Sequence, residues 1–215
     1  MDFIVITSAV VTVVHYLISL FVGIIIYYLI NDKSRESNKN QVNEIISEIV
    51  NFVIFLWVGK VLFNYSRLLE DPLIVFIIPS DSTSFYFAFL CMGGLFFYKF
   101  KQRRFDVGKF LQAFFPIFIF SSFCYEFIQL VWENNRFSFG YSLVLGILII
   151  VLLLTYGRVN NFHFITIMLV GWSIGLIILA FLQNHIVIFG YSIQIWFPGF
   201  ILAIVLLSIL KRKFV

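Results

Sequence analysis

A small set of ionisable and amide side chains lies inside long apolar stretches of this chain. Lys60 and Glu126 occupy two different stretches, and Gln129 follows Glu126 by three residues, so the two share one face of a helix. Glu133 lies one turn further on. Ionisable groups are costly in hydrocarbon and often mark a functional site. An ion pair between Lys60 and Glu126 would lower the cost of both, and we expect it to act either as a lipid-headgroup or substrate site or as a structural link between helices. The alternative is that the Lys60 side chain extends to the outer interface.

Other polar residues in the apolar stretches favour structural roles. His15 lies in the first stretch, and Asn51 and Asn64 lie in the second. A lone polar side chain in a membrane helix more often hydrogen-bonds to a neighbouring helix than takes part in a mechanism. Cys91 and Cys124 lack the spacing of metal ligands, so they predict neither a disulfide framework nor a zinc site.

Established catalytic motifs do not occur in this sequence. It contains no G-x-S-x-G, no H-E-x-x-H and no phosphate-binding P-loop. We therefore assign no catalytic residue, and we expect neither a cofactor nor a bound metal ion. Any activity would have to arise from the few polar groups inside the apolar stretches.

Membrane-spanning helices must position these polar groups. Hydrophobic residues make up 61% of the chain and charged residues only 12%, against roughly 45–50% and 25% in soluble domains. Seven apolar stretches approach the roughly 20 residues that cross a bilayer, and backbone groups in lipid must pair within a helix. The predicted fold is an all-α integral membrane bundle of seven transmembrane helices, one polytopic domain over residues 1–215. Pro116 and Pro198 predict kinks in the fourth and seventh helices. The predicted spans are Phe3–Ile30, Ile45–Tyr65, Ser84–Phe100, Phe110–Trp132, Phe139–Tyr156, Phe164–Leu182 and Ile193–Leu210.

Basic residues alternate between the predicted loops. Most of the 15 Lys and Arg residues fall in the first, third and fifth loops and at the C-terminus. Because Lys and Arg favour the cytoplasmic side, this pattern predicts an outside N-terminus and a cytoplasmic C-terminus. The net charge of +4 thus reflects membrane topology, and we expect no nucleic acid as a partner. In the second loop, Leu73–Ile78 is too short to span the membrane and predicts an interfacial or re-entrant segment.

Six short stretches resemble, in chain order, the landmark sequences of one family. They are Leu20–Ile26 (LFVGIII), Val58–Asn64 (VGKVLFN), Asp71–Leu73 (DPL), Thr83–Ala88 (TSFYFA), Tyr125–Glu133 (YEFIQLVWE) and Gly190–Gln194 (GYSIQ). In this order they resemble the prolipoprotein diacylglyceryl transferases, bacterial seven-helix enzymes with the N-terminus outside. These enzymes move a diacylglyceryl group from phosphatidylglycerol to a lipoprotein cysteine. The resemblance covers nearly the whole chain and implies a multi-pass protein of the bacterial cytoplasmic (inner) membrane.

The chain departs from this family at the residues that carry the chemistry. Tyr86 stands where the family has a histidine, and Glu126 stands where it has the arginine of its signature sequence. Gln129 replaces an asparagine of the same signature. Of that signature, only Glu133 is retained.

The family's second essential arginine and its outer head domain are also missing. The chain has no Lys or Arg between Arg158 and Lys211, and only Asn134–Arg136 stands in place of the head domain. Transfer from a phospholipid needs cations at the phosphate, and arginine binds phosphate bidentately. Because removing one stabilising group of this kind typically costs a factor of about 100 to 1,000 in rate, we expect a non-catalytic relative.

The sequence therefore predicts a lipid-binding accessory protein or a membrane-embedded subunit of a larger complex, with a membrane phospholipid and another membrane protein as partners. The predicted lipid-binding residues are Lys60, Tyr86, Glu126, Gln129 and Glu133. One alternative is an active phospholipid-dependent transferase of altered chemistry, with Glu126 or Glu133 as general base. Another is a small transporter, which would require a continuous polar path, although the predicted fifth to seventh spans are almost wholly apolar.

Overall fold

The computed structural model describes residues 2–31, 34–65, 82–102, 105–183 and 186–213, without the side chains of residues 2–9 and 213. These residues form seven helices and one β-hairpin. In chain order they are α1 (Asp2–Ile30), α2 (Arg35–Phe63), α5 (Ser82–Lys101), α6 (Val107–Val131), α7 (Phe137–Thr155), α8 (Asn161–Gln183), β1 (Ile186–Ile188), β2 (Tyr191–Ile193) and α9 (Trp196–Lys213). The segment Leu73–Ile78, predicted to be interfacial or re-entrant, lies outside the described residues.

Within these ranges, six helices are long and apolar enough to cross a membrane: α1, α2, α5, α6, α7 and α8. The chain therefore has the architecture of a multi-pass membrane protein, as its composition predicts. α9 is largely apolar from Trp196 to Leu210 and then ends in Lys211, Arg212 and Lys213. Its role as a seventh span stays a prediction.

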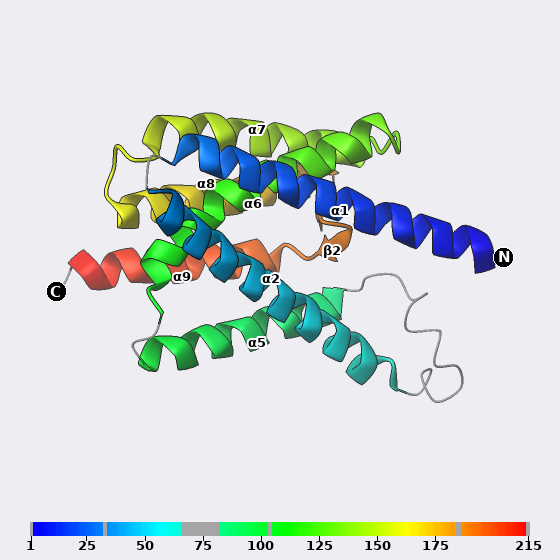
Figure 1. Ribbon diagram of the computed structural model, residues 1–215, viewed down its shortest axis with the longest axis horizontal. Coiled ribbons are helices and arrows are strands. Elements are labelled where there is room, and N and C mark those ends of the chain that lie inside the picture. Colours follow the sequence, from blue (N-terminus) through cyan, green and yellow to red (C-terminus); the bar gives the residue numbers. More distant parts are fainter. Residues whose placement is uncertain (1, 32–33, 66–81, 103–104, 184–185, 214–215) are drawn as a thin grey trace.

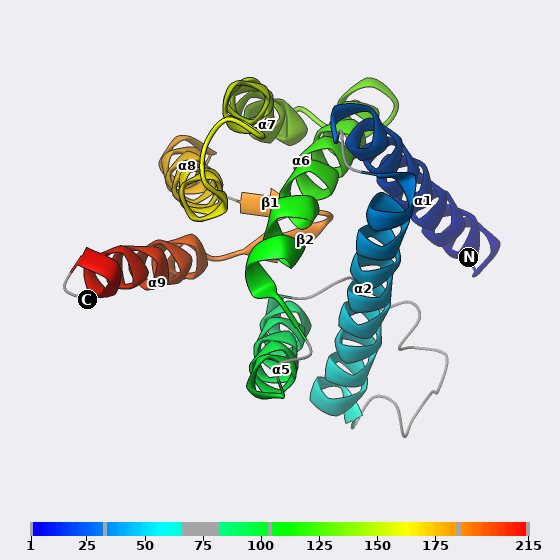
Figure 2. The same ribbon diagram turned by 60° about the vertical axis from the view of Figure 1, so that its left-hand side comes forward.

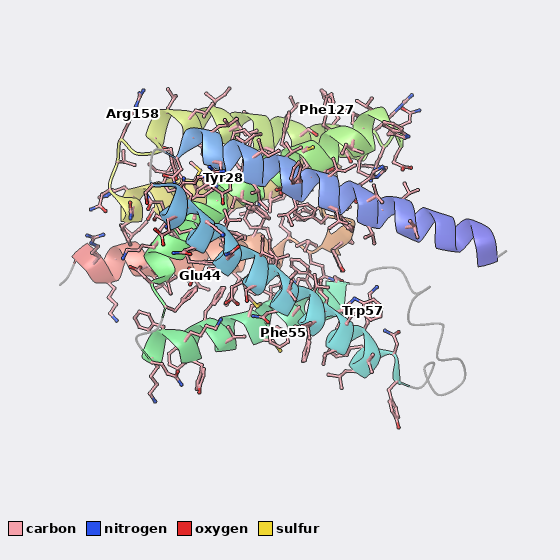
Figure 3. The ribbon with its side chains drawn as sticks, in the orientation of Figure 1. Tyr28, Glu44, Phe55, Trp57, Phe127 and Arg158 are labelled. Carbon is pink, nitrogen blue, oxygen red and sulfur yellow. The ribbon has the colours of Figure 1, made fainter. Side chains whose placement is uncertain are left out.

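The helices lie along the long axis of the molecule, and the two chain termini lie at opposite ends (Figure 1). The α1–α2, α5–α6 and α7–α8 junctions lie at the same end as the C-terminus, and Figure 3 labels Arg158 at the α7–α8 turn. These junctions hold the predicted basic loops, so we call this end the basic end. Its assignment to the cytoplasm stays a prediction.

α6 is the central helix of the bundle. It packs against α1, α2, α7 and α8, and Figure 2 shows it between the α7–α8 pair and the α1–α2 pair. α5 packs mainly against α2, and α9 packs against α8. Pro116 lies inside α6, as predicted. Pro198 instead lies in the first turn of α9, where its missing N–H breaks no helical hydrogen bond, so the predicted kink inside the last span is wrong.

A tight contact joins α1 to α6 at Gly23. A Cβ atom at this position would lie 2.1 Å from Ser121 Oγ and 2.6 Å from the carbonyl oxygen of Ile117. Both distances are far below van der Waals contact, so only glycine lets the two backbones approach this closely. The contact fixes the part of α6 that precedes Glu126.

A β-hairpin lies between α8 and α9, and the all-α prediction missed it. Ile186 pairs with Ile193 in antiparallel register. The two-residue turn Phe189–Gly190 has φ values of 49° and 76°, and positive values at both positions are those of a type I′ turn. Ile186, Ile188 and Ile193 are buried in the core that α6, α7, α8 and α9 share. The last helix accordingly begins at Trp196 rather than at Ile193.

α2 begins at Arg35, well before the predicted span that starts at Ile45. The side chain of Ser34 caps this helix by accepting a hydrogen bond from the backbone N–H of Ser37 at 3.4 Å. Apolarity alone placed the start too late, because the residues before Ile45 are mostly polar. They form a helical extension at the basic end.

Candidate functional site

Glu126 is a buried carboxylate on α6. It lies near the end of this helix that is farther from the basic end. Only 3% of its surface is exposed. A small cavity of about 20 Å³ lies beside it, which is room for about one water-sized group. The lining residues come from α6, the turn after it, α7, α8 and β1: Glu126, Asn135, Phe137, Ser138, Tyr141, Leu179, Gln183 and Val187.

α7 supplies hydroxyl groups to this cavity. The Ser138 side chain interacts with the Glu126 carboxylate. Tyr141 lies one turn further along α7, and its Oη accepts a hydrogen bond from Trp172 Nε1 at 3.0 Å. This bond fixes the Tyr141 ring and leaves its hydroxyl proton for a second partner.

α8 supplies an amide to the same cavity. Gln183 reaches it across Gly140, where a Cβ atom would lie 2.3 Å from Gln183 Nε2 and 2.6 Å from Leu179 Cδ1. Glycine at position 140 therefore makes room for the Gln183 side chain between α7 and α8. The cavity thus combines one carboxylate with hydroxyl and amide groups held by three helices.

No described Lys, Arg or His forms an ion pair with Glu126. The ion pairs between described side chains are Lys99–Glu48 and Lys109–Asp106. The predicted Lys60–Glu126 pair is therefore wrong. Lys60 lies in the last turn of α2, which packs mainly against α5, whereas the Glu126 cavity is built by α6, α7, α8 and β1. The sequence places both residues at a similar depth but does not define the direction in which each side chain points.

Three buried polar side chains on α1 and α6 have no hydrogen-bond partner in the described part of the chain: His15 (at Nδ1), Ser19 and Ser121. His15 does not make, through Nδ1, the bond to a neighbouring helix that the sequence predicts. Unpaired polar atoms are costly away from water, and more so in hydrocarbon. We call these three residues and Glu126 the α1–α6 polar cluster.

The hairpin turn is fixed between α1 and α6 by two tyrosines. The rings of Tyr16 and Tyr125 stack with their centroids 4.9 Å apart. Tyr16 Oη donates a hydrogen bond to the carbonyl oxygen of Phe189 at 2.8 Å. A Cβ atom on Gly190 would lie 3.2 Å from Tyr16 Oη and 3.7 Å from Tyr125 Oη. Since β1 of the same hairpin lines the Glu126 cavity, the turn holds one wall of the site.

Tyr86 has a different environment from the one predicted. Its Oη accepts a hydrogen bond from the backbone N–H of Gln194 at 2.8 Å. Its ring lies 4.6 Å from the ring of Trp196 and 5.6 Å from that of Phe197, measured between centroids. Tyr86 therefore joins α5 to the segment between β2 and α9, and it does not line the Glu126 cavity.

The remaining predicted lipid-binding residues lie near Glu126 along the chain. Gln129 is half-buried on α6, and Glu133 is exposed in the turn that follows α6. The structure thus brings Glu126 and Gln129 together on one helix and places Glu133 at its end. Lys60 and Tyr86 lie elsewhere.

Sequence analysis missed Asn135, Ser138, Tyr141 and Gln183, which line the cavity. Asn135 and Ser138 flank the short α6–α7 turn, and Gln183 is the last residue of α8. Consecutive antiparallel helices place the residues beside their connecting turn at one depth. Polar residues at the ends of the predicted spans were therefore the signal that could have identified the site.

Two landmarks of the transferase resemblance fall in these regions. Tyr125–Glu133 forms the end of α6 and the turn after it, and Gly190–Gln194 forms the hairpin turn, β2 and the residue that bonds to Tyr86. Asp71–Leu73 lies outside the described residues. The resemblance stays a prediction, because no family model, no curated protein and no solved structure matches the chain.

Proposed function

We propose that this chain is a seven-span protein of the bacterial cytoplasmic membrane, with its N-terminus outside, that binds an outer-leaflet phospholipid headgroup at Glu126. The observation that carries the proposal is a buried carboxylate beside a water-sized cavity, with no cationic partner among the described residues. The basic junctions gather at one end of the bundle, whereas Phe127, which follows Glu126 on α6, lies toward the other end (Figure 3). With the basic end in the cytoplasm, Glu126 faces the outer leaflet.

The chemistry of the cavity favours a ligand group that donates hydrogen bonds. A carboxylate can only accept them, and the volume of about 20 Å³ admits one hydroxyl or ammonium group rather than a whole headgroup. A glycerol hydroxyl of phosphatidylglycerol meets both requirements. Ser138 and Gln183 would complete its hydrogen bonds from the facing helices.

The proposal excludes transfer chemistry of the kind the resembled family performs. That chemistry needs cations at the phosphate, whereas the polar centre here is a carboxylate. The sequence also has no Lys or Arg between Arg158 and Lys211. The protein would therefore hold or present a lipid, as an accessory protein or as a subunit together with another membrane protein.

An enzyme of altered chemistry is the second candidate, favoured by the burial of Glu126 beside Ser138. A buried carboxylate of this kind can act as a general base toward a headgroup hydroxyl. Incubation with phosphatidylglycerol, followed by mass analysis of the lipids, tests this candidate. A product that forms with the wild type and not with Glu126→Gln would establish it, and unchanged lipid with both proteins would eliminate it.

Native mass spectrometry of the detergent-purified protein tests the binding proposal. The wild type should retain one phosphatidylglycerol per chain. Glu126→Met removes the acceptor at similar volume and should weaken retention by about tenfold or more. Arg136→Gln changes an exposed charge beside the turn that follows α6 and should retain the lipid like the wild type. Equal retention by all three proteins would contradict the site, and a stoichiometric protein partner in the spectrum would establish the subunit interpretation.

A further inference from the structure

A second polar surface lies at the basic end, at the corner between α1 and α2. It is an open groove of about 1000 Å³ lined by Tyr28, Arg35, Glu36, Lys39 and Asn43. Figure 3 labels Tyr28 on the part of α1 nearest this end. The groove is at the upper end of the size range of small-ligand sites, so it can admit a whole headgroup.

The two cations of this groove have no acidic partner among the side chains that the structure describes. Arg35 and Lys39 lie one turn apart on α2, so their side chains share a face, and both are exposed. Neither forms an ion pair with an acidic side chain in the described ranges, although Glu36 lines the same groove. The groove therefore offers two positive charges to a ligand.

Buried hydrogen bonds hold the corner rigid beneath the groove. Asn31 Nδ2 donates to Tyr27 Oη at 2.6 Å and to Asn38 Oδ1 at 2.9 Å. Asn38 Nδ2 donates back to the carbonyl oxygen of Asn31 at 3.2 Å, and Tyr27 Oη donates to Gln41 Oε1 at 2.7 Å. Because these bonds fix α1 against α2, the groove residues are positioned before any ligand binds.

An apolar stripe on α1 leads to the groove. Leu17, Phe21 and Ile25 precede Tyr28 on one face of the helix, and between 43% and 65% of each is exposed. A lipid whose acyl chains lie on this stripe would place its headgroup beside Tyr28. A soluble anion has no acyl chains and would not contact this stripe.

We propose that this groove binds the phosphate-bearing headgroup of an anionic phospholipid in the leaflet at the basic end. Arg35 and Lys39 donate to the phosphate oxygens, and arginine can do so with two parallel bonds. Tyr28 and Asn43 supply neutral donors, and Glu36 accepts from a headgroup hydroxyl. This site is independent of the function proposed for Glu126, because it uses other residues at the opposite end of the bundle.

Lipid titration followed by native mass spectrometry tests this groove. Because one phosphatidylglycerol is proposed to stay at Glu126, the groove is measured as the second phosphatidylglycerol that binds. The variant Arg35→Gln/Lys39→Gln should bind this second lipid roughly 10- to 30-fold more weakly, because each charge near an anionic headgroup contributes about one decade or slightly less. The matched control Lys101→Gln/Arg158→Gln removes two exposed charges from the same end and should bind like the wild type. Tyr28→Phe, which removes one hydroxyl, should weaken binding by about three- to tenfold. Glu126→Met should lose the lipid at Glu126 and still bind one phosphatidylglycerol in the groove, and adding Arg35→Gln/Lys39→Gln to it should remove that remaining lipid, so the two sites are distinguished.

Two results would overturn the proposal. Equal loss of phosphatidylglycerol in the groove variant and its control would show a general charge effect, and no loss in either would show that the groove does not bind the lipid. Soluble glycerol 1-phosphate tests whether the ligand of the groove is a lipid or a free phosphate ester. If it binds lipid-free protein as tightly as phosphatidylglycerol does, the groove belongs to a soluble phosphate ester and the lipid assignment fails. Circular dichroism and thermal unfolding of each variant confirm that the fold is kept.

Discussion

At the basic end, the buried polar groups satisfy one another. Tyr27, Asn31, Asn38 and Gln41 form one hydrogen-bonded network, and Glu48 accepts bonds from Lys99 and Asn51. The α1–α6 polar cluster is different. Its histidine Nδ1 and two serine hydroxyls have no hydrogen-bond partner within the described residues, and its carboxylate has no described cation.

This difference separates two uses of polar residues inside a bundle. The hydrogen bonds of a paired group offset most of the free energy that its desolvation costs, so removing the group weakens the fold. An unpaired buried group does not stabilise the fold and can lower its stability, and it is expected where a ligand completes its hydrogen bonds. The buried polar groups of the basic end therefore stabilise the fold, whereas the pattern of the α1–α6 polar cluster is typical of a binding site.

The largest expected effect is a loss of stability on breaking the pair at the basic end. Glu48→Met should lower the free energy of unfolding by about 2 kcal/mol, because it leaves Lys99 and Asn51 without their partner. The expected loss of stability is moderate because about a third of the Lys99 side chain is exposed, so water screens the ion pair. Titration of the protein with a denaturing detergent measures it. Glu48→Met/Lys99→Met should recover most of the loss, and a single variant as stable as the wild type would break the comparison.

The opposite sign is expected for the carboxylate of the α1–α6 polar cluster. Glu126→Met should raise the free energy of unfolding by about 1 kcal/mol, because methionine fills a similar volume without a desolvated charge. The same detergent titration applies. A loss comparable to that of Glu48→Met would show that Glu126 is a structural residue, and the distinction between the two regions would disappear.

A smaller effect is expected at the start of α6, at the basic end. The backbone N–H of Lys109 donates to Asp106 Oδ1 at 3.1 Å, and this bond holds the pKa of the Asp106 carboxyl below its usual value. Its stabilisation is therefore present above the unfolded pKa of about 3.9 and is lost as pH falls through the folded value. Asp106→Ala should cost about 0.7 kcal/mol at neutral pH.

The control for this prediction is Asp106→Asn, since asparagine caps a helix about as well as aspartate but does not titrate. Its stability should stay near that of the wild type at neutral pH, and this position should no longer contribute to the loss in acid. Thermal unfolding in detergent between pH 7 and pH 3 compares the three proteins. Identical acid profiles would show that Asp106 does not contribute to the pH dependence.

The smallest effect is expected at the serines of the α1–α6 polar cluster. Ser121→Ala removes a hydroxyl that has no described partner, so the free energy of unfolding should change by less than about 0.5 kcal/mol. The same measurement applies, with Ser142→Ala as control, because Ser142 Oγ donates to the carbonyl oxygen of Ser138 at 2.8 Å. A loss above 1 kcal/mol for Ser121→Ala would reveal a partner and sharpen the comparison in favour of a structural role.

The sequence predicted the features that depend on composition along the chain. Apolar length identified the helices, and the alternation of Lys and Arg correctly grouped the α1–α2, α5–α6 and α7–α8 junctions at one end. The sequence placed Glu126 among apolar residues, and the structure buries its side chain. Each of these signals requires only the order of residues and the thickness of a bilayer.

The sequence did not predict which neighbouring helix each polar side chain faces. Lys60 and Glu126 have a similar predicted depth, but α2 packs mainly against α5, whereas α6 carries Glu126 into the cavity beside α7 and α8. The hairpin was missed because its strands have three residues each, and its turn places Phe189 at positive φ, which a bulky residue adopts rarely. Burial between tertiary neighbours stabilises that turn, and local sequence does not report it.

The bond between Tyr16 and Phe189 joins residues that are 173 positions apart in the chain. During synthesis, α1 enters the bilayer long before the ribosome reaches the hairpin. Until α6 and the hairpin arrive, the tyrosine and its polar neighbours on α1 have neither of the surfaces that bury them in the finished bundle. The surroundings of Tyr16 are therefore completed only when the last part of the chain has been made, and the first helix reaches its final packing late in synthesis.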